Sequence, residues 1–190
     1  MALHLSFASV NMMVRQFKID HVVFALEGRS FRKDLYKPYK AHRKLDESAM
    51  TEKEIEENKM FWETYDIFLT YLKEKTNVSV IRHEHAEADD VIAVLTARLA
   101  PHGNVLILSS DKDFGQLQKY PNVTQYSPIL KRFIKIDDPK TFVREHIIKG
   151  DRGDGIPNFL SPDNCFAAGE RQKVISSKKL QEWIGQDVEA

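Results

Sequence analysis

Residues 104–114 read NVLILSSDKDF, and the first six of them form the most convincing strand pattern in the chain. The apolar run within residues 104–109 shows no polar alternation, which is typical of a strand buried on both faces of a parallel sheet. Two acids, Asp111 and Asp113, follow it almost directly. Because ligands of parallel sheets collect at the carboxyl ends of strands, this stretch predicts a candidate site as well as a strand.

The segments on either side alternate between helical and strand patterns. We expect helices where apolar residues recur every three or four positions and strands in short apolar runs. A helix after 138–139 is expected from Asp138 as N-cap and Pro139 at the first helical position. Alternating strands and helices predict an α/β fold with a mostly parallel sheet covered on both faces. The expected helices are 3–18, 51–75, 88–99, 139–149 and 177–184, and the expected strands are 21–26, 78–81, 104–109, 123–126 and 133–136.

Acidic residues gather in three short clusters, 87–90, 111–113 and 151–154, and one further acid follows the strand expected at 21–26. If these segments fold into one sheet, the clusters meet, and converging carboxylates repel one another unless a divalent cation lies between them. Hard oxygen ligands in this number favour Mg²⁺ or Mn²⁺. The expected metal ligands are Glu27, Glu87, Asp89, Asp90, Asp111, Asp113, Asp151 and Asp154.

Each cluster also has a plainer explanation. The acids of 87–90 suit the first turn of a helix, where the helix dipole favours them. Those of 111–113 suit a helix cap, those of 151–154 suit a turn, and Glu27 suits a strand exit. The metal hypothesis is favoured because it explains all the clusters together.

Composition limits the remaining classes of protein. A chain of 190 residues with 42% hydrophobic content supports one globular domain with a small appended module. No apolar run reaches membrane-spanning length and no cleavable leader is recognisable, so we expect a cytoplasmic protein. The single cysteine, Cys165, excludes an internal disulfide and a thiolate zinc site, and no nearby base supports a nucleophilic role.

The zero net charge hides a basic segment at residues 29–44, which contains one acid and three interleaved aromatic residues. Basic groups track phosphates, and aromatic faces stack on unpaired bases. A solvated loop is the plainer explanation, but the segment starts directly after an expected strand end, which favours nucleic-acid binding. Its basic residues are Arg29, Arg32, Lys33, Lys37, Lys40, Arg43 and Lys44, and its aromatic residues are Phe31, Tyr36 and Tyr39.

Four motifs in order resemble those of the flap endonuclease family. HAEADDVIAVL (85–95), SSDKDFGQL (109–117) and KGDRGDGIPN (149–158) resemble its metal-binding signatures. SFRKDLYKPYKAHR (30–43) resembles its helical arch, most closely in the bacterial polymerase-associated and bacteriophage exonuclease branch. The resemblance covers about residues 22–158, and the ordered set makes it specific.

The resemblance implies a PIN-like αβα sandwich and a structure-specific 5′ nuclease that removes flaps or RNA primers during replication and repair. Two divalent ions about 4 Å apart would activate a water and stabilise the leaving oxygen. The implied substrates are DNA with a free 5′ end or flap and RNA primer–DNA hybrids. We expect a monomer with no membrane partner, replication proteins as further partners, and the host cytoplasm as location for a phage-encoded chain.

The resemblance also implies individual roles. Glu87, Asp89, Asp90 and Asp111 match the tighter metal site, and Asp113, Asp151 and Asp154 match the second. Glu27 stands where the family usually has Asp. Lys40 matches the arch lysine at the scissile phosphate, with Arg32 and Arg43 holding the same charge, and Tyr39 stacking on the terminal base. The further candidates for nucleic-acid contact are Arg29, Lys33 and Lys44.

The N-terminus departs from the family pattern. Relatives begin with an apolar strand ending in a metal-binding Asp, whereas this chain opens at the following helix. The departure predicts an N-terminally incomplete product or a degenerate homologue. Unpaired backbone groups beside the gap would make the chain less stable and much less active than an intact relative.

The C-terminus departs as well. The domains we expect are a PIN-like core at 1–150, with its arch at about 29–60, and a DNA-binding region at 151–190. Residues 159–183 lack the glycine pattern of the helix-three-turn-helix, so this region is truncated or atypical, and a K⁺ site is more doubtful than duplex contact. The basic residues either contact duplex DNA or form a solvated tail; they are Arg171, Lys173, Lys178 and Lys179.

Two other functions remain open from the sequence. One is a noncatalytic binder of branched DNA that keeps the arch but cannot hold both ions. The other is an unrelated αβα phosphatase of the haloacid dehalogenase class, whose DxD motif is imitated by Asp111-Lys112-Asp113. That imitation comes too late in the chain, and the phosphatase would have no use for the basic segment.

Overall fold

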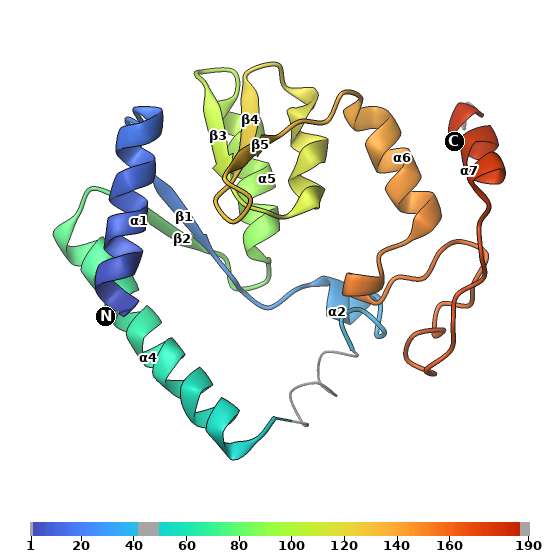
Figure 1. Cartoon of the computed structure of the whole chain (residues 1–190), viewed down its shortest axis with the longest axis horizontal. Coiled ribbons are helices and arrows are strands. Elements are labelled where there is room, and N and C mark those ends of the chain that lie inside the picture. The colour runs from blue at the N-terminus through green and yellow to red at the C-terminus, as the bar shows by residue number, and fades with distance from the viewer. Residues whose placement is uncertain (1, 42–49, 187–190) are drawn as a thin grey trace. The chain divides into compact units, whose positions relative to one another are not determined.

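The computed structural model describes residues 2–41 and 50–186 (Figure 1). Among these residues, no helix combines the length and apolar character that crossing a membrane requires. The α-helices are α1 (Ala2–Phe17), α2 (Arg32–Leu35), α4 (Glu52–Lys75), α5 (Ala88–Leu99), α6 (Pro139–Lys149) and α7 (Ser177–Gly185). The strands are β1 (Val23–Leu26), β2 (Ser79–Arg82), β3 (Val105–Leu108), β4 (Val123–Ser127) and β5 (Arg132–Ile134), with 3₁₀ helices η1 (Lys112–Lys119) and η2 (Arg152–Asp154).

The chain divides into two compact units. The first comprises Met1–Arg29 and Asp46–Val91, and the second comprises Ser30–Leu45 and Ile92–Ala190. Helix α5 begins in the first unit and continues in the second. Each unit has its own hydrophobic core and its own sheet.

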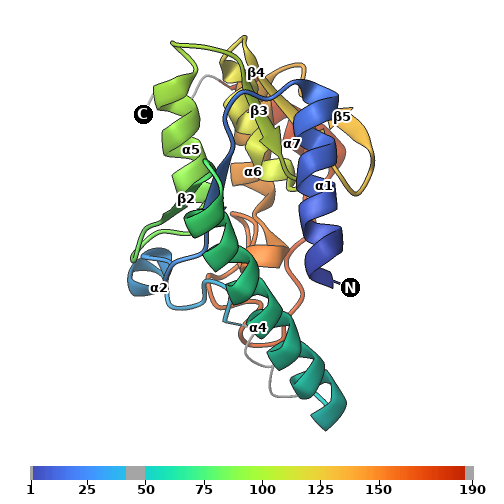
Figure 2. The same ribbon diagram turned by 90° about the vertical axis from the view of Figure 1, so that its left-hand side faces the viewer.

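The first unit packs α1 and α4 onto a two-stranded parallel sheet. Strands β1 and β2 run in register from Val23 opposite Ser79 to Leu26 opposite Arg82. The apolar face of α1 contacts α4, and the two helices lie side by side in Figure 2. Burying these faces supplies the hydrophobic stabilisation of the unit. Its core residues are Leu26, Phe68, Leu69 and Leu72, with Leu3, Phe7, Val10 and Phe24 packed against them.

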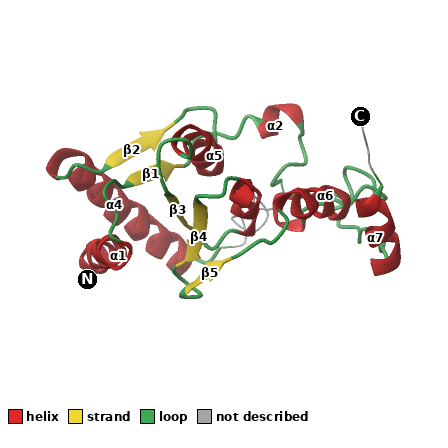
Figure 3. Ribbon diagram, turned by 90° about the horizontal axis from the view of Figure 1, so that it is seen from above, coloured by secondary structure: helices red, strands yellow, loops and turns green. Residues whose placement is uncertain are grey.

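The second unit is built on the three strands β3, β4 and β5, seen from above in Figure 3. β3 and β4 are parallel, whereas β4 and β5 are antiparallel. The turn between β4 and β5 is far too short for the crossover that parallel strands need, which sets this pairing. The core residues between the sheet, α5 and η1 are Ala100, Ile107, Phe114, Leu117 and Val123.

The predicted α/β class with mostly parallel strands is confirmed. Every predicted helix and strand is present with ends that differ by a few residues, and Asp138 caps α6 as expected. The expectation of one sheet was wrong, because the described strands form two hydrogen-bonded sheets. The predicted domain boundary at residue 150 stays a prediction.

Gly28 shows how closely the loops after β1 and β2 approach each other. Its N–H donates to the carbonyl of Ala86 at 3.0 Å. A Cβ at this position would lie 1.9 Å from the carbonyl oxygen of His83 and 2.6 Å from that of Ala86. Only glycine therefore fits where the acid-bearing ends of the two strands meet.

We expect Gly28→Ala to lower the free energy of unfolding by about 2–4 kcal/mol, because backbone atoms must move to admit the methyl group. Urea denaturation followed by circular dichroism measures this change. Gly103→Ala is the matched control, since a Cβ there meets nothing within 4 Å. Equal stability of the two variants would contradict the close approach of the loops.

Candidate metal centre

The segment that follows β3 is fixed by buried hydrogen bonds. Gln125 on β4 is fully buried, and its side-chain amide donates to the carbonyls of Ser109, at 3.0 Å, and Asp111. The Asp111 carboxylate caps η1 by accepting the N–H of Asp113 at 2.9 Å. The plainer explanation of Asp111 as a helix cap is therefore confirmed, and the capping also places Asp113 at the start of η1.

A glycine turn positions the next acidic cluster. Gly150 ends α6 with φ 68°, and a Cβ there would lie 2.4 Å from the carbonyl oxygen of Ile156. Asp151 and Ile156 then exchange two backbone hydrogen bonds of 2.8 Å. The Oδ1 atom of Asp151 accepts the N–H groups of Gly153 at 2.7 Å and Asp154 at 3.2 Å, which leaves Oδ2 to face the rest of the unit.

Asp113, His146 and Asp151 come together at this point. The Nε2 atom of His146 lies 3.0 Å from Asp151 Oδ2 and 3.4 Å from Asp113 Oδ1. One ligand atom from each of the three residues lies within 4.8 Å of the others. The Nζ atom of Lys112 also contacts Asp151 Oδ2, at 3.0 Å. The imidazole of His146, on α6, thus contacts two carboxylates: that of Asp113 at the start of η1 and that of Asp151 in the glycine turn.

The two carboxylates have opposite electrostatic environments. Burial, and then the charge of Asp111, raise the pKa of Asp113. Burial also works to raise the pKa of Asp151, but hydrogen bonds from Lys112 and His146 outweigh it and lower that pKa. Asp113 Oδ1 is a buried oxygen with no hydrogen-bond partner among the described residues. A buried, unsatisfied carboxylate oxygen beside two acids is an arrangement that a cation would stabilise.

Asp154 points to a different set of partners. Its Oδ2 accepts the hydroxyl of Tyr39 at 3.1 Å, and its Oδ1 lies 3.5 Å from Lys40 Nζ. Lys40 has a left-handed backbone, φ 53°, and its N–H donates to the Asp154 carbonyl at 2.8 Å. Non-glycine residues adopt this conformation rarely, and the surrounding contacts must impose it. The basic segment is thereby tied to the acidic turn.

The other residues predicted to contact nucleic acid differ in their exposure to solvent. Tyr39 is only 4% exposed, so its ring does not offer a free face for stacking on a base, contrary to our expectation. The Arg32 guanidinium lies 4.8 Å from the Phe31 ring centroid. Arg29 and Lys33 are exposed. Arg43 and Lys44 lie outside the described residues.

The remaining acids belong to the first unit, at the N-terminus of α5. Glu27 accepts the N–H of Ala88 at 3.2 Å, and Asp90 accepts the N–H of Glu87 at 3.0 Å. Glu87 is buried. These contacts confirm the favourable helix-start position of the acids and bring Glu27 beside the 87–90 cluster. Asp89 is half-buried on the same turn.

The region after the acidic turn is irregular and is organised by one amide. The side chain of Asn158 is buried, accepts the N–H of Leu160 and the hydroxyl of Ser161, and donates to the carbonyl of Lys173. The hydroxyl of Tyr36 donates to the carbonyl of Asp163, which links this region to the basic segment. The predicted basic contacts are all exposed; they are Arg171, Lys173, Lys178 and Lys179.

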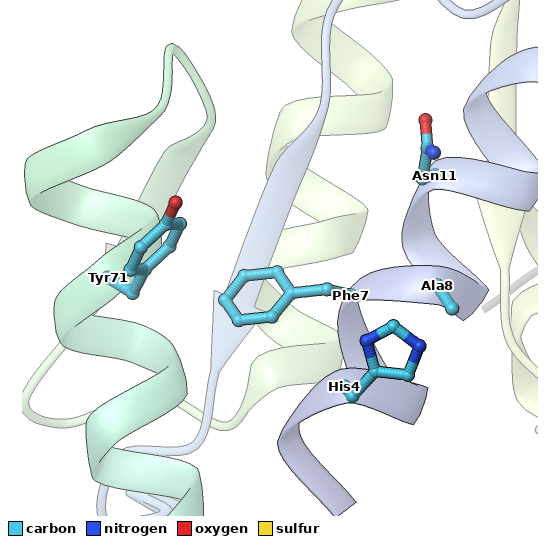
Figure 4. A pocket seen from close by; sticks show the side chains of 5 residues that line it. All are labelled: His4, Phe7, Ala8, Asn11 and Tyr71. Atoms are coloured by element: carbon cyan, nitrogen blue, oxygen red, sulfur yellow. The ribbon is translucent and has the colours of Figure 1, made fainter. Parts of the chain in front are cut away.

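The surface hollows of the described residues in the first unit include two that adjoin α4. The larger, about 440 Å³, opens between α1 and α4 and is shown in Figure 4. His4, Phe7 and Tyr71 border it, together with Ala8 and Asn11. The second follows the C-terminal half of α4. Neither hollow is lined by a residue that we expected to bind metal or nucleic acid.

Three residues of the second-unit site were missed from the sequence. His146 lies in the expected helix five residues before Asp151, and a His beside an acidic cluster was the available signal. Lys112 was read only as part of an acidic motif. Gln125 carried no signal, because its role depends on complete burial beside a chain segment that is distant in sequence.

Solved structures share the fold. The chain superimposes on the bacteriophage T5 5′-exonuclease with bound divalent metal ions (zinc) with a TM-score of 0.73 and 20% identity, over 96% of this chain and 75% of that one. It matches the bacteriophage T5 flap endonuclease in complex with DNA and metal ions with a TM-score of 0.73 and 19% identity, over 96% and 77% of the two chains. At these identities, the likeness shows the fold alone.

Proteins found by sequence comparison share a higher percentage of identical residues with the chain. The chain is 40% identical to ribonuclease H of Enterobacteria phage T4 over 108 residues, which are 54% of this chain and 35% of that protein. It is 34% identical to DNA polymerase I of Rhizobium leguminosarum over 147 residues, 73% of this chain and 13% of the polymerase. The chain thus spans a minor part of these two proteins.

Two findings establish the family. The chain is 31% identical to flap endonuclease Xni of Shewanella piezotolerans over 187 residues, 85% of this chain and 68% of that protein. The family model for the 5′-3′ exonuclease N-terminal resolvase-like domain matches residues 1–147. This membership disfavours the phosphatase alternative. The chain belongs to the 5′-3′ exonuclease family.

Proposed function

We propose that this chain is a metal-dependent, structure-specific 5′ nuclease that hydrolyses phosphodiester bonds in DNA with a free 5′ end or flap, or in RNA primers. The observation that carries the proposal is the buried, unsatisfied Asp113 Oδ1 beside Asp151 and His146 in a chain of the 5′-3′ exonuclease family. Neither the phosphatase nor a purely structural role accounts for both the buried Oδ1 atom of Asp113 and the family membership.

Divalent cations fit the residues that are present. The buried oxygen of Asp113 needs a partner, and the charge of Asp111 adds to the local excess of negative charge. The bacteriophage T5 5′-exonuclease was solved with divalent metal ions, which supports the same class of ion here. We propose Mg²⁺ or Mn²⁺, which in nucleases activate the attacking water and stabilise the leaving oxygen.

Two sets of residues would hold the ions. Asp113 and Asp151 would hold one ion, and Asp154 would join them only by exchanging its partners Tyr39 and Lys40. The assignment of a second ion to Glu87, Asp89, Asp90 and Asp111 rests on the order of the sequence motifs. Glu27 would support it through its contact with the N–H of Ala88.

Lys40 would stabilise the reacting phosphate. Its ammonium lies 3.5 Å from Asp154 and 4.9 Å from the Tyr39 ring centroid, so the side chain is held near the acidic turn. A positioned ammonium that meets negative charge as it develops lowers the barrier more than it strengthens substrate binding. Arg32 and the residues of the basic segment would contact the DNA backbone. The complex of the T5 flap endonuclease with DNA supports a DNA substrate.

The acidic residues are tested by cleavage. A 5′-labelled flap substrate should be shortened in the presence of Mg²⁺ or Mn²⁺. Asp111→Asn combined with Asp113→Asn should reduce cleavage to background and leave DNA binding in EDTA intact, because the amides keep the shape and lose the ligand charge. Cleavage that survives this double substitution would overturn the proposed nuclease site.

Lys40→Ala should slow single-turnover cleavage by about a hundredfold with a much smaller change in the Kd for DNA. Lys73→Ala, an exposed lysine of α4 that lies outside the basic segment, is the control and should change the cleavage rate little. Equal losses of rate and affinity in Lys40→Ala would reduce Lys40 to a simple phosphate anchor.

Asp113 links stability to pH and to metal. Because the pKa of Asp113 is raised in the folded state, ionisation of Asp113 lowers the free energy of unfolding. This loss is absent at pH values below the pKa of Asp113 in the unfolded chain, and it is complete at pH values above its pKa in the folded protein. Asp113→Asn should therefore raise the Tm of the metal-free protein at neutral pH, and the difference should shrink as the pH falls through the pKa of Asp113.

Mg²⁺ or Mn²⁺ at a hundredfold excess over Kd should stabilise the wild type by about 2.7 kcal/mol. Asp113→Asn should lose most of this gain, because it removes a ligand charge. Differential scanning calorimetry measures both effects. A wild-type Tm that does not change with millimolar cation would contradict a preformed cation site.

A further inference from the structure

We propose that His146 is itself a metal ligand, and that its imidazole nitrogen makes this site prefer first-row transition-metal ions to Mg²⁺. The inference rests on the proposed function, since it concerns the same cation. It adds a nitrogen ligand that no carboxylate motif of the sequence indicates, and it identifies the class of ion. The three residues that would bind the ion together are Asp113, His146 and Asp151.

The two distances from His146 to the carboxylates match the edges of a coordination polyhedron. Two ligand atoms about 2.1 Å from one ion, at angles between tetrahedral and octahedral values, lie about 3.0–3.4 Å apart. The Nε2 atom of His146 lies 3.0 Å from Asp151 Oδ2 and 3.4 Å from Asp113 Oδ1. All three ligand atoms lie within 4.8 Å of one another, so one ion could contact all three once the side chains adjust to it.

The surrounding structure holds the imidazole toward the carboxylates. His146 lies in the last turn of α6, a helix whose first turn is fixed by the Asp138 cap. The Phe142 ring packs on the imidazole with centroids 5.7 Å apart and planes 26° apart. Nε2 is the nitrogen that faces both acids. A ring supported on one face by an aromatic side chain is a preorganised ligand.

Lys112 is the competing cation at Asp151, but it is a weak competitor. Its ammonium contacts Asp151 Oδ2 at 3.0 Å, and its side chain is 62% exposed. Ion pairs of such exposed lysines contribute little, because water solvates the freed ammonium well. A divalent ion can therefore displace Lys112 from Asp151.

Nitrogen ligation predicts the class of ion. Mg²⁺ takes oxygen ligands and releases its waters reluctantly, whereas imidazole suits Zn²⁺ and other first-row transition-metal ions. A site of two carboxylates alone would discriminate less between these ions. His146 should therefore add affinity for Zn²⁺ and almost none for Mg²⁺.

The simpler alternative is that His146 only donates a hydrogen bond to Asp151. In that case, Nε2 carries a proton, and metal binding leaves the imidazole unchanged. As a ligand, Nε2 must be unprotonated and must bond to the ion. The two roles therefore give different signals from the same nitrogen.

Calorimetric titration of the full chain with Zn²⁺ and with Mg²⁺ tests the selectivity. His146→Gln should weaken Zn²⁺ binding by about ten- to a hundredfold or more and change Mg²⁺ binding little. His102→Gln is the matched control, an exposed histidine in the turn after α5. It should leave both affinities unchanged. Equal Zn²⁺ affinity of wild type and His146→Gln would overturn the inference.

A second measurement observes the metal-bound nitrogen in the wild-type protein itself. In wild-type protein with ¹⁵N-labelled histidine, stoichiometric Zn²⁺ should shift the Nε2 resonance of one imidazole. This resonance is assigned to His146 because the spectrum of His146→Gln lacks it. An unshifted His146 resonance would also overturn the inference. A chain that cuts DNA with Mg²⁺ but shows no nitrogen ligand loses only this inference, whereas a chain that binds no divalent ion loses the proposed function too.

Discussion

Repulsion between neighbouring carboxylates is the constraint on which the second unit depends. Asp113 and Asp151 come from a strand end and a glycine turn, and each is held there by backbone hydrogen bonds. Without those bonds, the two charges would separate into water. The two carboxylates have different partners. Lys112 and His146 form hydrogen bonds with Asp151, whereas Asp113 keeps a buried oxygen with no hydrogen-bond partner among the described residues. The unpaired oxygen of Asp113 lowers the stability of the metal-free protein, and a bound cation would remove this effect.

The backbone around the acids holds the carboxylates close together. Gln125 fixes the segment after β3, and Gly150 allows the sharp turn that returns Asp151 toward His146. Lys40 adopts a rare backbone conformation against Asp154. Such features cost stability in isolation, and they are common where a protein arranges groups for chemistry. Contacts of Tyr39 and Lys40 thus connect the described part of the basic segment to the acidic turn.

Much of the fold followed from the sequence, because periodicity and caps are local. The apolar run before Asp111, the Asp138-Pro139 start of α6 and the long helix α4 each required only nearby residues. Strand pairing is not local, so the two separate sheets and the antiparallel β5 were missed. The site shows the same division. Acidic motifs predicted Asp113 and Asp151 as ligands, and the structure brings these two together, whereas the buried position of Tyr39 and the approach of His146 depend on tertiary packing.

Paramagnetic relaxation by Mn²⁺ tests the central claim most directly. At substoichiometric Mn²⁺, backbone amide signals near a bound ion broaden first, whichever side chains supply the ligands. An ion held by Asp113, His146 and Asp151 should selectively broaden the amides of Lys112–Asp113, His146 and Asp151–Asp154, and EDTA should reverse the broadening. Broadening confined to other acidic surfaces, with these amides unaffected, would contradict this claim.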